Sequence, residues 1–289
     1  MKTQAEIHKC KSEYREAWTI QTKMLQITQN QSPYQHANTL LNLAETAVSM
    51  GVQKQDVQEN IELAKSIFTT LNLKPLIIYC DAILADLYIR EKNLLAAKKL
   101  LKKCLKLVTE DSEIKLFCFE RLGNASSWDV DELTSDWTTI FLINSLKLKA
   151  KLRVYMALQF LGQIFLTNKD ENTAVSLFTV ALMGFTYMDV HRSRAECMIR
   201  LGDISSRCGD LLKAVELWES ARPLFERSSQ MKEVQYVDDR LSCVSSNFLD
   251  CHSQNIAHLV RLDVPSGNLF HIEDEERVEF IGELNQLTM

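Results

Sequence analysis

The sequence predicts an all-α protein built as an α-solenoid, which is a row of antiparallel helix pairs. Two observations carry this prediction. The 289 residues include only 8 glycines and 4 prolines, which is too few for the many turns of an all-β chain. In addition, a pattern of small and large apolar residues recurs at intervals of about 40 residues, as expected when one structural unit is repeated along a chain.

The repeat is clearest when segment 161–181 is aligned without gaps to segment 201–221. A small residue is followed by a second small residue twelve positions later, then by a large apolar residue, then by a third small residue. Segment 84–104 fits the same rule with Ala85, Ala97, Leu101 and Cys104. The matched pairs, in order, are Leu161 with Leu201, Gly162 with Gly202, Ala174 with Ala214, Phe178 with Trp218, and Ala181 with Ala221.

The spacing predicts two helices per unit, packed closely where the small residues lie. Asn93, Asp170 and Asp210 stand at equivalent positions between the small residues and are suited to cap the second helix. Gly202 costs about 1 kcal/mol of helix propensity, so we expect it to permit the close approach of a neighbouring helix. Gly209 is expected to end the first helix in the left-handed conformation that glycine tolerates.

This pattern resembles the tetratricopeptide repeat (TPR) family, whose units pair a tryptophan-leucine-glycine helix with an alanine-aromatic-alanine helix. The resemblance covers about residues 5–260. It implies a TPR-like right-handed superhelix in which the first helices line a concave groove. The period of 40 departs from the family's 34 residues and resembles the long-repeat arrays attached to fungal signal-transduction ATPases. The signature positions fall on Met198, Leu201, Gly202, Gly209, Ala214, Trp218 and Ala221, and in the preceding unit on Leu158, Leu161, Gly162, Ala174, Phe178 and Ala181.

The same markers divide the chain into a TPR-like helical repeat domain, residues 1–248, and an acidic tail, residues 249–289. The tail loses the periodic pattern and is predicted to be mostly disordered. Pro223 is expected to kink or end the helix that contains it. The predicted units are 35–71, 76–108, a degenerate unit 114–147, 150–187 and 190–228, followed by a capping helix over 231–248.

Composition limits the classes of partner and the compartment. The net charge is −5, and residues 249–289 alone hold eight acidic against two basic residues, so the repeat domain is close to neutral and offers no footprint for nucleic acid. The amino-terminal stretch has no apolar signal region, and no uncharged run is long enough to cross a membrane. Eight scattered cysteines without a CxxC pair favour reduced thiols in the cytoplasm, with the nucleus as an alternative.

Motifs of catalysis, metal binding and cofactor binding are missing from the sequence, which has no GxSxG, HExxH, GxGxxG or P-loop pattern. We therefore expect no enzyme activity and no cofactor. The leading hypothesis is a noncatalytic scaffold that binds a partner protein or peptide along its concave surface. An alternative is a regulatory or sensor array detached from, or acting with, a P-loop signal-transduction ATPase. A helical enzyme would need a buried pocket with convergent polar groups.

Two surfaces are candidates for partner binding. The first is the groove implied by the resemblance, for which the template gives Tyr79, Asp86, Arg90, Glu120, Gln159, Gln163, Ile199 and Asp203. Its mixture of acidic and amide groups does not match the lysine and asparagine clamp that some TPR domains use for a terminal carboxylate. The second is the basic stretch Lys98–Lys106, which is either a solvated helix face or a docking surface for an acidic partner or for the chain's own tail.

Overall fold

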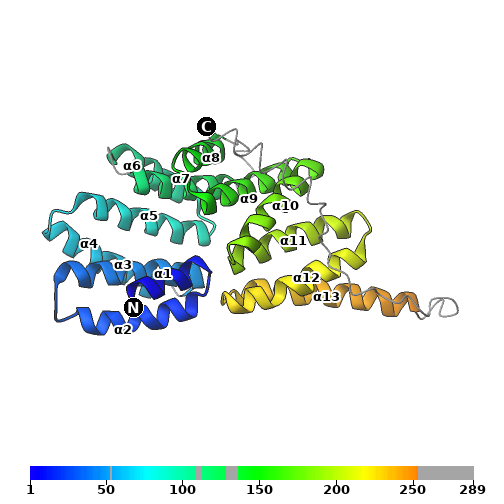
Figure 1. The fold of residues 1–289 in the computed structure, drawn as a ribbon, viewed down its shortest axis with the longest axis horizontal. Helices are drawn as coiled ribbons and strands as arrows, with labels where there is room; N and C mark the ends of the chain where they lie inside the picture. Colours follow the sequence, from blue (N-terminus) through cyan, green and yellow to red (C-terminus); the bar gives the residue numbers. More distant parts are fainter. Residues whose placement is uncertain (53, 109–111, 128–135, 253–289) are drawn as a thin grey trace.

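The computed structural model describes residues 1–52, 54–108, 112–127 and 136–252, and this part of the chain consists of thirteen α-helices without a β-strand (Figure 1). The predicted all-α solenoid is therefore confirmed. The helices are α1 (Lys2–Cys10), α2 (Tyr14–Thr28), α3 (Pro33–Met50), α4 (Lys54–Thr70), α5 (Lys74–Arg90), α6 (Leu94–Leu107), α7 (Ser112–Ser127), α8 (Asp136–Lys147), α9 (Lys151–Thr167), α10 (Glu171–Tyr187), α11 (His191–Arg207), α12 (Leu211–Arg227) and α13 (Met231–His252).

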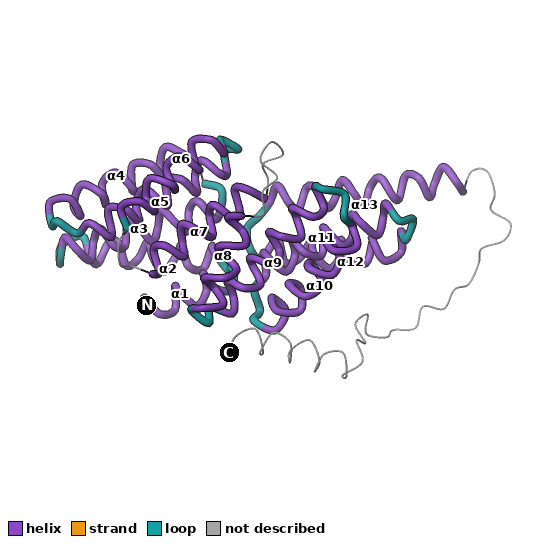
Figure 2. Tube along the Cα trace, turned by 90° about the horizontal axis from the view of Figure 1, so that it is seen from above, coloured by secondary structure: helices purple, strands orange, loops and turns teal. Residues whose placement is uncertain are grey.

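Consecutive helices pack side by side along the whole row, and a second set of contacts links alternate helices. Helix α3 contacts α5, α5 contacts α7, and α7 contacts α9. From α3 to α9 the odd-numbered helices therefore form one layer, and Figure 2 shows α4 and α6 together along one side of it. We call the surface of the odd-numbered layer the inner face.

Short connections of nearly constant geometry produce this regular stacking. Most of them are three residues long, and the middle residue adopts a left-handed backbone, as at Lys92, Lys169 and Gly209 with φ of 60°, 65° and 87°. The residue that follows is the predicted cap in three cases. Asn93, Asp170 and Asp210 accept hydrogen bonds from backbone N–H groups three residues later, at 3.3, 3.1 and 3.2 Å. The predicted caps and the left-handed Gly209 are confirmed.

Two glycines inside helices, Gly162 and Gly202, mark places where an aromatic ring of the next helix comes close to the backbone. A Cβ atom placed on Gly202 would lie 2.7 Å from Nε1 of Trp218, and one on Gly162 would lie 3.1 Å from the ring of Phe178. Both rings belong to the following helix and are fully buried. The expectation that Gly162 and Gly202 permit close helix packing is thus correct, and the group that fills the space is the aromatic residue of the same unit.

The hydrophobic core is divided into two large clusters. One extends over α3 to α7 and includes Leu41, Phe68 and Leu101. The other extends over α10 to α13 and includes Phe178 and Trp218. A small cluster of Leu116, Phe141 and Ala157 lies between them, at the helices predicted as a degenerate unit. The chain therefore has an amino-terminal half and a carboxy-terminal half with separate cores.

Two helix ends differ from the boundaries expected. Of the two effects expected of Pro223, it does not end α12, which continues to Arg227 because its next turn is held by buried Phe225 and by packing against α13. Helix α13 continues to His252, four residues beyond the predicted cap, so 249–252 are helical rather than part of the tail. The remaining tail residues, 253–289, lie outside the described part of the chain.

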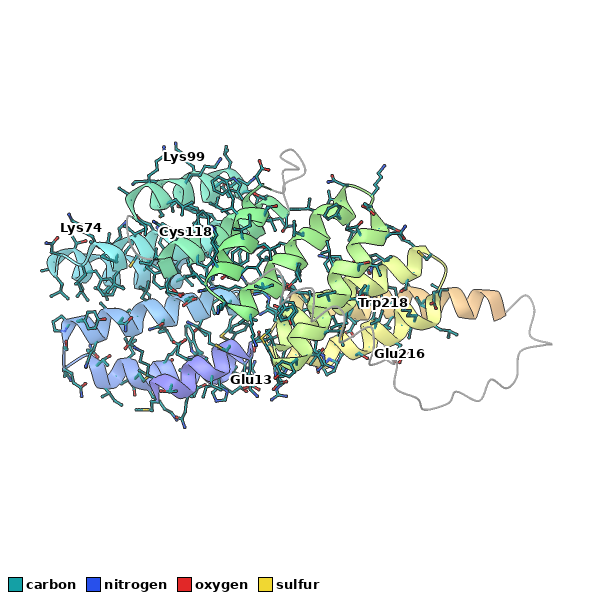
Figure 3. All side chains as sticks on the ribbon, turned by 45° about the horizontal axis from the view of Figure 1, so that its top comes forward. Glu13, Lys74, Lys99, Cys118, Glu216 and Trp218 are labelled. Atoms are coloured by element: carbon teal, nitrogen blue, oxygen red, sulfur yellow. The ribbon has the colours of Figure 1, made fainter. Side chains whose placement is uncertain are left out.

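The two halves also contact each other directly, through turns at the middle of the molecule. We call this contact the junction. The backbone N–H of His191 donates to the carbonyl of Lys11 at 3.1 Å, and Lys11 pairs with Asp189 at 2.7 Å. Glu13, which Figure 3 labels between the halves, accepts from Arg227 at 2.5 Å. The amino-terminal pair α1–α2 is thereby tied to helices that follow it by about 180 residues in sequence.

A second group of hydrogen bonds extends the junction. Arg90 donates to the carbonyl oxygen of Ser49 at 2.5 Å and to the side-chain oxygen of Gln230 at 3.2 Å. Gln230 is buried and donates in turn to the same Ser49 carbonyl at 2.8 Å. The turn after α12 is therefore fixed against the ends of α3 and α5, so the junction joins the two halves at a second place.

Candidate interaction surface

The inner face of the amino-terminal half is covered by a network of paired charges. Arg121 of α7 is the centre of this network, since it pairs with Glu120, with Asp86 of α5 at 3.4 Å and with Glu45 of α3 at 3.9 Å. Its guanidinium also lies 3.7 Å from the ring centroid of Phe117. One cation thus neutralises carboxylates from three successive odd-numbered helices, which fixes their spacing along the inner face.

Two further cations extend this network at its edges. Lys9 of α1 donates to Glu45 at 2.8 Å, and the hydroxyl of Tyr79 donates to the same carboxylate at 3.3 Å. Arg153 of α9 bridges Glu120 at 3.3 Å and the exposed Glu113 at 2.8 Å. The network therefore joins α1, α3, α5, α7 and α9.

Protonation states inside the network follow from burial and pairing. Burial alone would raise the pKa of the Glu45 carboxyl, but Lys9 and Arg121 outweigh burial and hold this pKa below its ordinary value. Burial and the nearby Glu45 charge raise the pKa of Tyr79 well above its usual value. Near neutral pH the network therefore consists of a charged Glu45, a charged Arg121 and a neutral Tyr79 that donates a hydrogen bond.

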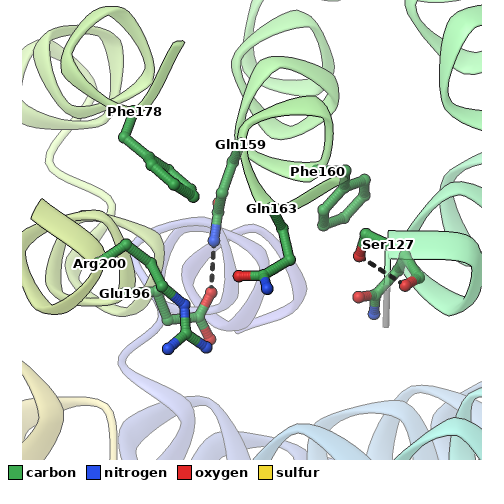
Figure 4. Close-up of a pocket in the computed structure, with 8 residues that line it drawn as sticks. Ser127, Gln159, Phe160, Gln163, Phe178, Glu196 and Arg200 are labelled. Carbon is green, nitrogen blue, oxygen red and sulfur yellow. Dashed lines mark hydrogen bonds between the residues drawn. The ribbon is translucent and has the colours of Figure 1, made fainter. Parts of the chain in front are cut away.

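Farther along the inner face, the networked charges give way to a small pocket with neutral amide groups (Figure 4). Its volume is about 50 Å³, which is enough for one small side chain or for one or two water molecules. Side chains of α7, α9, α10 and α11 line it: Asn124, Ser127, Gln159, Phe160, Gln163, Phe178, Glu196 and Arg200.

The hydrogen bonding of the pocket leaves one amide available. Gln159 donates to Glu196 at 2.7 Å, and Arg192 donates to the other oxygen of that carboxylate at 2.8 Å. Ser127 donates to the carbonyl of Asn124 at 2.7 Å. The side-chain amide of Gln163 forms no hydrogen bond within the described residues, and Figure 4 shows it pointing into the space between Glu196 and Ser127. A free primary amide can both donate to and accept from a peptide group.

The structure places the eight groove residues inferred from the sequence in three environments. Gln159 and Gln163 line the pocket. Tyr79, Asp86 and Glu120 belong to the charge network, and Arg90 to the junction. Ile199 and Asp203 are buried, at 5% and 8% exposure. The expectation that Ile199 faces an open groove was wrong, because it is part of the apolar core of the carboxy-terminal half. Asp203 instead accepts a hydrogen bond from Tyr236 of α13 at 2.8 Å.

The basic stretch of α6 divides between interior and surface. Lys98 is only 4% exposed, so it was wrongly included in the predicted basic face. Lys99, Lys102, Lys103 and Lys106 are exposed, and Figure 3 shows Lys99 at the outer edge of the molecule. A contact of these lysines with the tail remains a prediction, since residues 253–289 are outside the described part.

Sequence reasoning missed the residues that organise the inner face. The repeat pattern does not identify Glu45, Arg121 or Glu196 as functional residues. Their roles arise from contacts between helices that are distant in sequence. A usable signal was present for Arg121, because a charged residue inside the apolar segment Ile114–Leu122 must find a partner when the helix is buried.

The described residues contain no group of three or more histidine, cysteine, aspartate or glutamate side chains arranged to hold a metal ion. No helix in the described part of the chain combines the length and the apolar character needed to cross a bilayer.

The fold and the inner face together define the class of protein, which is an all-α helical-repeat solenoid. Solved structures of helical-repeat proteins are similar to this chain. No protein-family model and no curated relative matches the sequence. A Rap protein, solved in complex with Competence and Sporulation Factor, superposes with a TM-score of 0.60 at 13% identity, over 86% of this chain and 74% of that chain. This likeness supports the TPR-like helical-repeat fold.

Two other structures superpose less well, both with TM-scores of 0.45. One is BtubC from P. vanneervenii, at 14% identity over 78% of this chain and 99% of that chain. The other is a signal-transduction ATPase with numerous domains from Pyrococcus horikoshii, which carries a tetratricopeptide repeat sensor. It is matched at 13% identity over 86% of this chain and 47% of that one.

Proposed function

We propose that this chain is a noncatalytic protein-interaction scaffold of the TPR type, which binds an extended segment of a partner protein or peptide along its inner face. The observation that carries the proposal is the pocket around Gln163, where polar side chains from α7, α9 and α11 converge and one amide has no partner among the described residues. An extended peptide offers a free N–H and a free C=O at every residue, which is the complement of a free primary amide.

The similarity to the Rap protein supports the same proposal, because that protein was solved with Competence and Sporulation Factor bound. We also propose that the chain acts in the cytoplasm and does not bind nucleic acid. The alternative, a sensor array that acts with a P-loop ATPase, predicts that such an ATPase co-purifies with the chain.

The test is selection of ligands from a library of random 12-residue peptides displayed on phage, using the full chain as bait. Selected peptides are then measured by fluorescence anisotropy against Gln163→Glu, which keeps the shape of the side chain, removes its N–H donors and adds a negative charge beside Glu196. We expect affinity to fall by about tenfold, since an unmade hydrogen bond and a like charge act together.

The matched control is Gln26→Ala, which alters an exposed glutamine of α2 away from the pocket. This control should bind like the unmodified chain. Recovery of no binding peptide, or equal affinity for the Gln163 variant and the control, would contradict the proposal that the inner face is the binding surface.

A further inference from the structure

Four lysines of α6 form a row on the outer surface of the solenoid, well away from the inner face. Lys99, Lys102, Lys103 and Lys106 are all exposed and follow helical spacing, so they lie on one side of the helix. Among the described residues none of the four has an ion pair or hydrogen bond, although Lys102 lies 5.7 Å from the ring centroid of Trp137. We call these four residues the lysine row.

The row has the features of a docking surface for an acidic segment. Like charges three and four residues apart on a helix repel one another and destabilise it, so an anionic partner would stabilise α6. Exposed leucines stand beyond each end of the row, Leu95 at 83% and Leu107 at 54% exposure. The opposite side of α6 is buried against α5 and α7, which leaves the row as the accessible side.

The sequence itself contains a segment of matching chemistry. Residues 253–289 hold seven acidic and two basic residues, a net charge of −5 that equals the net charge of the whole chain. Six of the seven acidic residues lie between Glu273 and Glu283. Apolar residues flank the acidic run, with Phe270 and Ile272 before it and Phe280 and Ile281 toward its end. Acidic centre and apolar flanks complement the lysine row and its two exposed leucines.

Geometry disfavours this contact within one copy of the chain. Figures 1 and 2 both show α6 on the left, in the amino-terminal half, and the end of α13 on the far right of the molecule. Twenty residues, 253–272, separate His252 from the acidic run. A random coil of twenty residues would have a root-mean-square end-to-end distance of roughly 25 Å. This is less than the length of α13 alone, about 33 Å for its 22 residues.

We propose that the acidic run of one copy binds the lysine row of another copy, so that copies associate head to tail. A contact between two different surfaces of identical chains is heterologous and can either close into a ring or continue as an open assembly. The contact is electrostatic and exposed, so salt must weaken it. It is independent of ligand binding at the inner face, and neither proposal requires the other.

Sedimentation velocity on the full chain at low and high salt tests this proposal. We expect the average mass to rise with protein concentration at about 50 mM salt and to return to the monomer at about 500 mM salt. The row variant K99Q/K102Q/K103Q/K106Q and the run variant E273Q/D274N/E275Q/E276Q should each associate at least about tenfold more weakly. The matched control, K147Q/K149Q/K151Q/K169Q, removes the same charge from other exposed lysines and should associate normally.

The decisive sample is a mixture of the row variant and the run variant. The row variant keeps an intact acidic run and the run variant keeps an intact lysine row, so the mixture should form one-to-one complexes although each variant alone is monomeric. Circular dichroism of each variant verifies that the helices are retained. An unmodified chain that stays monomeric at low salt would overturn the proposal, as would a mixture without complexes or association that neither variant weakens.

Discussion

Replacing Gly202 by alanine tests how tightly the two helices of one unit are packed. The new Cβ atom would lie 2.7 Å from Nε1 and 2.8 Å from Cδ1 of Trp218, and 3.3 Å from the carbonyl oxygen of Ala214. Carbon atoms do not normally approach this closely, and Trp218 is 2% exposed, so its ring has no open space into which to move. The substitution must therefore displace α12 or strain the indole.

Two opposing effects set the magnitude. Alanine gains about 1 kcal/mol over glycine in a helix interior, whereas overpacking of a filled core costs typically about 1–3 kcal/mol. We expect Gly202→Ala to lose up to about 2 kcal/mol of unfolding free energy. Gly123→Ala is the matched control, because its nearest neighbour would be an ordinary 3.4 Å away. This control should gain up to about 1 kcal/mol.

The assay is urea unfolding followed by circular dichroism for both variants and for each combined with Trp218→Phe. A smaller ring relieves the contact, so Trp218→Phe should cost less in the Gly202→Ala background than in the unmodified chain. A Gly202→Ala variant as stable as Gly123→Ala, with additive effects of Trp218→Phe, would refute the packing argument.

Three other stability predictions follow from buried polar groups and backbone geometry. Both side-chain amide atoms of Gln21 are buried without a hydrogen-bond partner. Gln21→Met should therefore raise the free energy of unfolding by about 1–3 kcal/mol, because the desolvation cost of the amide is removed. The urea midpoint should rise accordingly, and an unchanged or lower midpoint contradicts this. Glu45 has a lowered pKa in the folded chain, so its stabilisation is present above its unfolded pKa near 4.3 and is lost as pH falls through the folded value. Glu45→Gln should then be less stable at pH 7 and lose less on acidification, as urea midpoints between pH 3 and 7 would report. Gly209→Ala should cost about 1–2 kcal/mol in thermal unfolding because φ is +87°, although a Cβ there meets no atom within 4 Å; a neutral effect would show that the turn can relax.

Much of the fold could be read from the sequence, because the repeat is a local pattern. Gly202 and Trp218 are sixteen residues apart on the two helices of one unit, so the helix period and the short turn between α11 and α12 determine that they meet. The capping roles of Asn93, Asp170 and Asp210 likewise depend only on the residues of the turn in which each one lies. These inferences needed only the geometry of one helix pair.

The inner face could be read only in part, because it depends on contacts between units. The template gave the face on which Gln159 and Gln163 lie, but it did not reveal that Glu45, Asp86 and Glu120 share Arg121. Ile199 was misplaced because a repeat template treats every unit as equivalent, whereas α11 packs against α10 and α12 with nine of its residues buried.

The junction changes how this solenoid should respond to local damage. In an ordinary repeat array each unit interacts only with its neighbours, so stability propagates step by step along one dimension. Here Glu13, between α1 and α2, accepts a hydrogen bond from Arg227, and Ser49 of α3 accepts one from Gln230. The last helices are therefore also neighbours of the first three. Loss of a single contact near residue 227 should therefore loosen helices α1 and α2 before it affects α6, and fraying would begin at two places that are far apart in the chain.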